Sequence, residues 1–148
     1  MKREIKFRGK RVDNGAWIYG SYHPHEDKML GIVSEKDVLE NKKSLIIIDG
    51  MSDWNLSKPI NYYEVIPESV GEYTGLKDSK NVEIYEGDFL KLSDEYRGKG
   101  EIPSYVIWEN SQWMMQGIMH YSHKDFIMNY SLDNMNVIGN IYDNPELL

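Results

Sequence analysis

The sequence predicts a mainly β protein with short helices, that is, a β-dominated α+β fold. Strand-like stretches alternate apolar and polar residues, as Ile5-Lys6-Phe7-Arg8 does near the N-terminus. Turn dipeptides such as Asn14-Gly15 and Asp49-Gly50 separate these stretches. Hydrophobic residues make up 41% of the chain and aromatic residues 12%, which is enough to build a core.

The length of 148 residues suits one domain or two small lobes. We place the boundary near Pro67-Glu68, because Pro67 stops a predicted strand and the sequence after it is dense in alternating strands and turn dipeptides. The expected organisation is an N-terminal β lobe over residues 1–67 and a second lobe over residues 68–148.

In the N-terminal lobe, residues 4–22 predict a hairpin with a two-residue turn at Asn14-Gly15. Trp17 and Tyr19 share one face of its second strand, and the basic residues of the first strand are expected on its exposed face. Further strands are predicted at 29–33, at 45–48, where an apolar run indicates burial, and at 62–66. A short helix is predicted at 34–43, and residues 51–61 are predicted to form a loop that covers Trp54.

In the second lobe, Gly87-Asp88 stands immediately before an alternating strand that runs to residue 92. Small SH3-like barrels enter their first long strand in this way, so we expect an SH3-like small barrel. Strands are predicted at 105–108, 113–118 and 137–142, the first two joined at 109–112. Residues 93–101 are predicted to form a loop, residues 120–135 fit either a helix or an irregular loop, and the tail is expected to make one helical turn from Pro145.

Composition excludes several classes of function. The chain has no cysteine, so disulfides, thiolate nucleophiles and zinc–thiolate sites are impossible. Its longest aliphatic run, 45–48, is far too short to span a membrane, and no apolar segment of signal-peptide length follows the charged N-terminus. We therefore expect a cytoplasmic protein without membrane association.

Charge is distributed unevenly along the chain. The formal net charge is −7, yet residues 1–11 hold six basic side chains and one acidic one. The basic stretch, together with nearby aromatic residues, is a candidate interaction surface made of Lys2, Arg3, Lys6, Arg8, Lys10, Arg11, Trp17 and Tyr19. It could bind single-stranded nucleic acid by stacking and charge, or it could be a solvated face that pairs with acidic groups. The net negative charge favours the second interpretation.

Three stretches resemble the YopX-like family of phage and prophage proteins. They are Arg3-Glu4-Ile5-Lys6-Phe7-Arg8-Gly9, the middle block from Val70 to Asp88, and Val137 to Leu148 at the end. Where the family pattern usually has a Lys-Asn-Gly-Lys-like turn, this chain has Ser79-Lys80-Asn81-Val82. The resemblance implies an SH3-like barrel in the second half, homo-oligomerisation and a bacterial host cytoplasm, and it supplies no catalytic or binding residues.

Two histidine pairs are candidate metal ligands. His23 and His25 would share a strand face, and neutral imidazoles bind zinc, but a polar turn started by Pro24 is the preferred interpretation. His120 and His123 would be neighbours on a helix, but ordinary partly exposed histidines are the preferred interpretation. We expect no metal and no cofactor.

The carboxylates Glu83, Glu86 and Asp88 could suggest acid–base chemistry. Gly87 interrupts the strand between the last two, so Asp88 is better explained as a turn residue. The sequence also has no nucleophile elbow, phosphate-binding loop or dinucleotide fingerprint. We expect no enzymatic activity, and we expect Trp54, Trp108 and Trp113 to be core residues.

Two classes of function remain. The first is a non-enzymatic, self-associating protein-interaction module that binds a phage or host protein and forms a dimer or a trimer. The second is a nucleic-acid-binding accessory module that uses the basic N-terminal strand. In the first case, the basic N-terminus and the acidic tail from Asp143 could set the register of the assembly.

Overall fold

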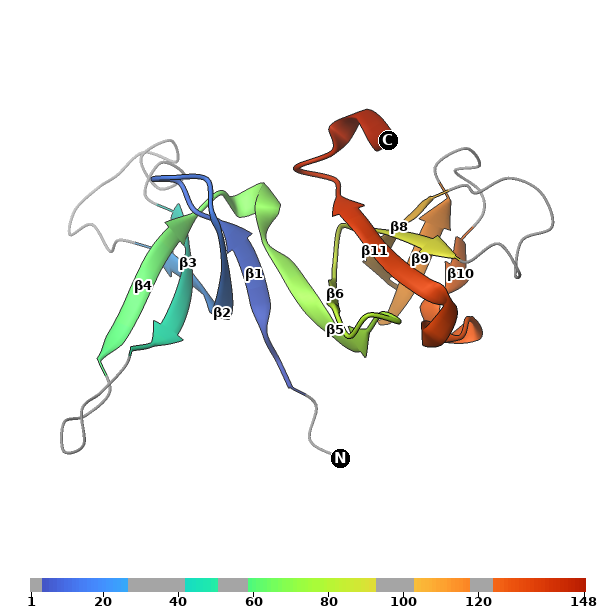
Figure 1. The fold of residues 1–148 in the computed structure, drawn as a ribbon. Coiled ribbons are helices and arrows are strands. Elements are labelled where there is room, and N and C mark those ends of the chain that lie inside the picture. Colours follow the sequence, from blue (N-terminus) through green and yellow to red (C-terminus); the bar gives the residue numbers. More distant parts are fainter. Residues whose placement is uncertain (1–3, 27–41, 51–58, 93–102, 118–123) are drawn as a thin grey trace. The chain divides into compact units, whose positions relative to one another are not determined.

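The computed structural model describes residues 4–26, 42–50, 59–92, 103–117 and 124–148. These residues form antiparallel strands joined by turns, and their helices are single 3-10 turns (Figure 1). The prediction of a mainly β fold with short helices is confirmed. Within the described part of the chain, no helix has the length and apolar character needed to cross a membrane.

The chain divides into two compact units. Ile5–Val70 forms the first unit, and Gly71–Leu148 belongs to the second. The predicted lobe boundary at residues 67 and 68 lies in the 3-10 turn η1 (Pro67–Ser69), at the end of the first unit. Each unit is described by itself below.

The first unit is a rolled antiparallel sheet. Its strands follow the order β4-β3-β2-β1 and span Phe7–Lys10 (β1), Trp17–Glu26 (β2), Lys42–Asp49 (β3) and Ile60–Val65 (β4). Residues that follow β1 meet the far strand: Arg11 bridges Val65, and the Val12 N–H donates to the Glu64 carbonyl at 3.0 Å. These bonds close the roll at one end, around the buried side chains of Ile46 and Val65.

The predicted hairpin is present, but its turn is longer than predicted. Lys10 pairs with Trp17, and the Arg11 N–H donates to the Ala16 carbonyl at 2.9 Å, so the loop between the strands is not a two-residue turn at Asn14-Gly15. Gly15 alone takes a positive φ there, +69°, while the Asn14 side chain accepts a bond from the Ala16 N–H. The dipeptide was identified correctly as a turn signal, but it closes a wider loop.

The apolar run 45–48 is a strand, as predicted, but it is not buried throughout. Only Ile46 of the run is fully buried, while Leu45, Ile47 and Ile48 are partly exposed. The predicted strand 29–33, most of the predicted helix 34–43 and Trp54 lie outside the described residues. Lys42 and Lys43, the end of that predicted helix, belong to β3.

The second unit contains a β5–β6 pair and a five-stranded sheet of order β10-β9-β8-β7-β11. The strands span Gly71–Lys77 (β5), Glu83–Tyr85 (β6), Asp88–Leu92 (β7), Ser104–Glu109 (β8), Gln112–Gly117 (β9), Lys124–Phe126 (β10) and Met135–Asn140 (β11). The 3-10 turns span Ile127–Asn129 (η2), Leu132–Asn134 (η3) and Pro145–Leu147 (η4). Thus η4 confirms the predicted helical turn of the tail, and η2 and η3 show short turns where a helix or a loop was expected. The loop predicted at 93–101 lies outside the described residues.

One core holds the second unit together. Its buried members come from β6, β7, β8, β9, η2 and β11, and they are Ile84, Leu90, Leu92, Val106, Met115, Ile127 and Met135. β7 is more buried than an alternating strand would be, because four of its five residues are buried. The five-stranded sheet agrees with a β-rich second lobe, while an SH3-like barrel stays a prediction.

Asp78 ties the turn after β5 to the last strand. Its carboxylate accepts bonds from the backbone N–H groups of Lys80 and Val82, each at 2.8 Å, and of Val137 at 3.0 Å. Asn81, in the family's turn position, takes a φ of +66°. Asn tolerates this left-handed conformation, so it can serve where the family pattern has Gly.

Candidate interaction surfaces

The predicted basic surface lies on the β1–β2 hairpin and the residue after β1. Arg8 and Lys10 lie in β1, Lys6 immediately precedes it, and Arg11 begins the loop. Tyr19 stands opposite Arg8, and Trp17 opposite Lys10. Lys2 and Arg3 lie outside the described residues.

The expectation that the basic residues of the first strand are exposed is wrong for Arg8. Its side chain is buried, and the guanidinium carbon lies 4.8 Å from the centroid of the Trp17 ring. A guanidinium is planar and weakly hydrated, so it can leave bulk water and stack on an aromatic face. Arg8 is therefore a packing residue of the first unit as well as a cation.

Two other cations also lie over aromatic rings of the same unit. The Lys6 ammonium is 5.9 Å from the ring centroid of Tyr19, and the Arg11 guanidinium carbon is 4.3 Å from that of Tyr63. Arg11 also donates from Nε to the Asp13 carboxylate at 2.9 Å. This bond lowers the pKa of Asp13 from its usual range. The basic side chains thus have partners within the unit that an external phosphate would have to displace.

The histidines of β2 do not gather a ligand set. His23 and His25 share a face of the strand, as predicted, and their ring centroids are 6.0 Å apart. No group of three or more His, Asp or Glu residues suited to a metal ion occurs in the described part of the chain. The preferred polar-turn interpretation is wrong, since both residues lie in β2. The absence of a metal stays a prediction, and His120 and His123 lie outside the described residues.

The carboxylates around Gly87 are tied into the backbone. Asp88 is buried, and its carboxylate accepts a bond from the Tyr85 N–H at 2.8 Å across the turn in which Gly87 has a φ of +81°. This confirms Asp88 as a turn residue. Glu83 accepts a bond from the Tyr85 hydroxyl at 2.7 Å. Burial raises the pKa of Glu86, and the neighbouring Glu72 carboxylate raises it further.

A first unpredicted surface is one face of β2, β3 and β4, which we call the outer sheet face. Its apolar members are Leu45, Ile47, Ile60 and Tyr62, and His25, Lys43 and Glu64 border them around a hollow of about 550 Å³. The strand register places Ile47 beside Tyr62 and Leu45 beside Glu64. Ile60 is 68% exposed and Tyr62 70% exposed, although they stand on a sheet. Lys43 and Glu64 form an ion pair of 3.7 Å at the border.

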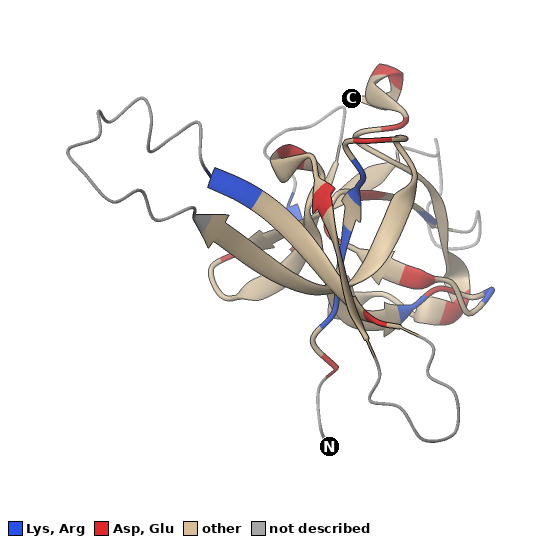
Figure 2. Ribbon diagram, turned by 90° about the vertical axis from the view of Figure 1, so that its left-hand side faces the viewer, with Lys and Arg blue, Asp and Glu red and all other residues tan. Residues whose placement is uncertain are grey.

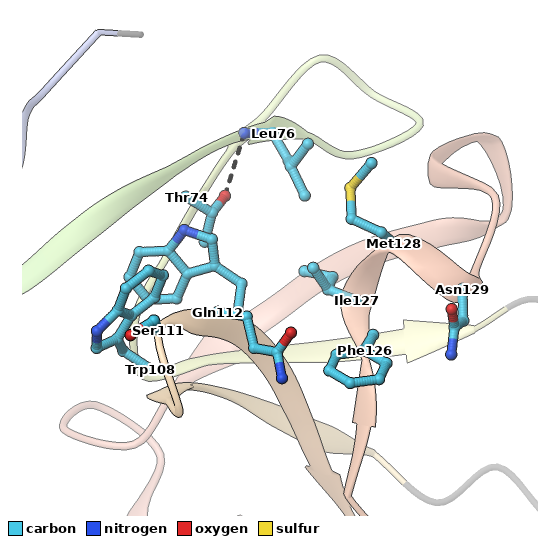
Figure 3. Close-up of a pocket in the computed structure, with 10 residues that line it drawn as sticks. Thr74, Leu76, Trp108, Ser111, Gln112, Phe126, Ile127, Met128 and Asn129 are labelled. Atoms are coloured by element: carbon cyan, nitrogen blue, oxygen red, sulfur yellow. Dashed lines mark hydrogen bonds between the residues drawn. The ribbon is translucent and has the colours of Figure 1, made fainter.

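A second unpredicted surface lies in the second unit, and we call it the tryptophan hollow. It has a volume of about 460 Å³ and is lined by Thr74, Leu76, Trp108, Ser111, Gln112, Trp113, Phe126, Ile127, Met128 and Asn129 (Figure 3). None of these ten lining residues is charged. The ring centroids of Trp108 and Trp113 are 4.7 Å apart, in an edge-to-face arrangement.

The prediction that the tryptophans are core residues is wrong for Trp108. Trp113 is partly buried and packs against the core of the second unit, but Trp108 is 44% exposed. The two stand opposite each other next to the β8–β9 turn, where the hairpin runs beyond the core. Size alone favours burial of tryptophan, but here the position near a strand end leaves one ring partly in water.

Neither hollow was predicted from the sequence as a binding surface. The outer sheet face left a signal: Ile60 and Tyr62 alternate with polar Asn61, which is typical of one apolar strand face. That pattern does not say whether the chain itself covers the face. The tryptophan hollow combines residues from β5, the β8–β9 hairpin, β10 and η2, which no short stretch of sequence brings together.

Comparison with known proteins gives a family and similar solved structures. The family model described as YopX protein matches residues 6–148. The crystal structure of protein EF1440 from Enterococcus faecalis is similar, with a TM-score of 0.58 and 22% sequence identity over 99% of each chain. At that identity the likeness concerns the fold. The comparison with curated proteins gives no match.

Proposed function

The chain belongs to the YopX family, and we propose that it is a non-enzymatic accessory protein that acts by binding proteins, among them further copies of itself. The expected setting is the cytoplasm of a bacterial host that carries a phage or prophage genome. The partner other than itself is expected to be a phage or host protein.

The outer sheet face is the observation that carries the self-association. Ile60 and Tyr62 lie next to Leu45 and Ile47, so the exposed side chains form one apolar area. Removing apolar surface from water contributes roughly 25 cal/mol per Å². A contiguous area of this kind on a protein surface is typical of an interface.

A second copy of the chain suits this face because the face carries both signs of charge. Lys43 and Glu64 lie on adjacent strands at its border. In a dimer, a two-fold axis through the apolar centre can bring Lys43 of one copy to the partner's Glu64, and the reverse pair follows by symmetry. Exposed ion pairs of this kind contribute only about 0–1 kcal/mol each, so they would set the register while apolar contact supplies the affinity.

Light scattering at micromolar concentration and moderate salt tests the proposal. We expect a dimer or trimer for the native chain and a single chain of 17.4 kDa for Tyr62→Lys, which places a cation in the apolar area. Val12→Ser is the matched control, because Val12 is also exposed in the first unit but lies outside the outer sheet face. A native chain that stays monomeric over this range would refute self-association.

Nucleic-acid binding is the alternative, and the basic β1–β2 hairpin favours it. Exposed Tyr19 beside Lys6 offers a ring and a cation together, as single-strand binding proteins do. Retention on single-stranded DNA that falls steeply with salt, and that Lys6→Glu weakens, would support this alternative.

A further inference from the structure

We propose that the tryptophan hollow binds a cationic peptide segment of another protein, which inserts one large apolar side chain into the hollow beside the tryptophan rings. The inference rests on the proposed function insofar as the chain acts by binding proteins. It concerns the second unit, whereas self-association is assigned to the outer sheet face of the first.

The hollow has the lining of a site for an apolar anchor. Buried Ile127 belongs to the core of the unit and partly buried Leu76 packs against it, while Trp108, Phe126 and Met128 are 44%, 40% and 72% exposed. Its volume of about 460 Å³ lies in the range of roughly 300–1,000 Å³ that is typical of ligand pockets. Uncharged polar groups of Ser111, Gln112 and Asn129 also line it and can bond a peptide backbone (Figure 3).

Hydrogen bonds and strand pairing within the unit position several lining residues of the hollow without a ligand. The Thr74 hydroxyl donates to the Ile84 carbonyl at 2.8 Å and accepts from the Leu76 N–H at 3.1 Å. On the other side, Trp108 and Trp113 are directly paired across the β8–β9 hairpin. A preformed site loses less conformational entropy on binding, which favours affinity for a short segment.

Charge around the hollow selects a cationic partner. Asp125 precedes the lining residue Phe126, and its carboxylate accepts bonds from Asn129 Nδ2 at 2.6 Å and the Tyr130 hydroxyl at 2.9 Å. Glu86 accepts a bond from the backbone N–H of Trp108. The nearby Lys124 is neutralised by Glu109 at 2.7 Å. Asp125 and Glu86 therefore each bond a residue that lines the uncharged hollow.

The charge of residues 71–148, which contain the hollow, acts in the same direction. Residues 71–148 contain six Lys or Arg and thirteen Asp or Glu, a formal balance of −7, whereas residues 5–70 contain nine and ten, a balance of −1. Figure 2 shows Asp and Glu in red, among them an acidic residue in the C-terminal turn η4, and Lys and Arg in blue. Such a field attracts lysine-rich segments and repels a phosphate backbone, so bases are disfavoured as the stacking partners of Trp108.

Nuclear magnetic resonance with short synthetic peptides tests the inference. The probe has a central phenylalanine between flanking lysines, and it is compared with versions carrying a central alanine or flanking glutamates. We expect saturable shifts of the indole N–H signals of Trp108 and Trp113 and none of Trp17, with binding at least about tenfold weaker for either altered peptide. Higher salt should weaken the binding of the lysine-flanked peptide.

Two variants make the result specific. Trp108→Ala should weaken binding at least about tenfold, while Ile138→Ala, which removes an exposed apolar side chain outside the hollow, should leave it unchanged. Absence of saturable shifts at millimolar peptide, equal binding of the glutamate-flanked version, or stronger shifts with an oligothymidine would overturn the inference. None of these outcomes bears on light scattering by the native chain, so self-association is judged separately.

Discussion

At the scale of single residues, Arg8 and Lys6 should respond differently to the same substitution. Arg8 is buried against Trp17, whereas Lys6 is partly exposed beside Tyr19. Arg8→Glu places an anion where a stacked cation stood, and we expect it to cost on the order of 3 kcal/mol of folding free energy. Lys6→Glu should cost less than about 1 kcal/mol. Urea denaturation of both variants measures the difference, and equal losses would show that Arg8 is not a packing residue.

Asp78 gives a second expectation, because one side chain satisfies three backbone donors. Asp78→Ala leaves these N–H groups without their acceptor and should destabilise the second unit by roughly 2–4 kcal/mol. Asp133→Ala, at the exposed residue of the 3-10 turn η3, is the matched control and should change stability by less than about 0.5 kcal/mol. Chemical denaturation followed by tryptophan fluorescence measures both.

Asp78 also predicts a sensitivity to acid. Burial alone would raise its pKa, but the backbone N–H groups of Val137, Val82 and Lys80 favour the charged form, and the pKa is lowered overall. The stabilisation is therefore present above the ordinary pKa of about 3.9 and disappears as the pH falls through the lower pKa of the folded chain. Between neutral pH and this acid range, stability should fall more steeply for the native chain than for Asp78→Asn. Parallel pH profiles would contradict this expectation.

The residue types around these positions were visible in the sequence, but their environments were not. Composition identified Lys6, Arg8 and Arg11 as a basic group near Trp17 and Tyr19. Alternation then placed Arg8 on a solvent face, because a period of two cannot show that a strand is covered on both sides. Asp88 was identified correctly, since Gly87-Asp88 is a local turn signal that needs no distant partner.

At the scale of elements, the β8–β9 turn offers a stabilising substitution. Asn110 and Ser111 have φ values of +52° and +64°, the conformation of a two-residue hairpin turn that favours Asn-Gly. Serine is strained in the left-handed region, so Ser111→Gly should raise stability by about 0.5–1 kcal/mol. Ser111→Val should lower it, because a β-branched residue fits that region worse. Thermal denaturation of the two variants should show melting shifts of opposite sign.

Element existence was more predictable than element surroundings. The strands near 45–48, 62–66, 105–108 and 113–118 were predicted because each is a run of apolar or aromatic residues bounded by turn residues. The burial of those strands was not predictable, because Leu45 and Ile47 have the same character as buried Ile46 but face the other way. For the same reason, the apolar run 45–48 could not show that Leu45 and Ile47 belong to the outer sheet face.

At the scale of the whole molecule, the charge and the two proposed surfaces divide between the units. The first unit, residues 5–70, carries the outer sheet face with a balance of −1, and residues 71–148 of the second carry the tryptophan hollow with a balance of −7. The family match over residues 6–148 fits a fold shared along nearly the whole chain. It does not identify either surface, since function depends on the side chains that a fold presents.

This division predicts that the two activities can be removed one at a time. Sites without shared partners usually respond independently to substitution, so Tyr62→Lys should abolish self-association and leave the affinity for the lysine-flanked peptide within about threefold of native. Conversely, Trp108→Ala should bind the lysine-flanked peptide at least about tenfold more weakly and still scatter light as the native assembly does. Measuring both properties on both variants completes the comparison. A Tyr62→Lys chain that binds the peptide about tenfold more weakly would mean that the hollow depends on the assembly, because the substituted side chain belongs to the first unit and lines no part of the hollow.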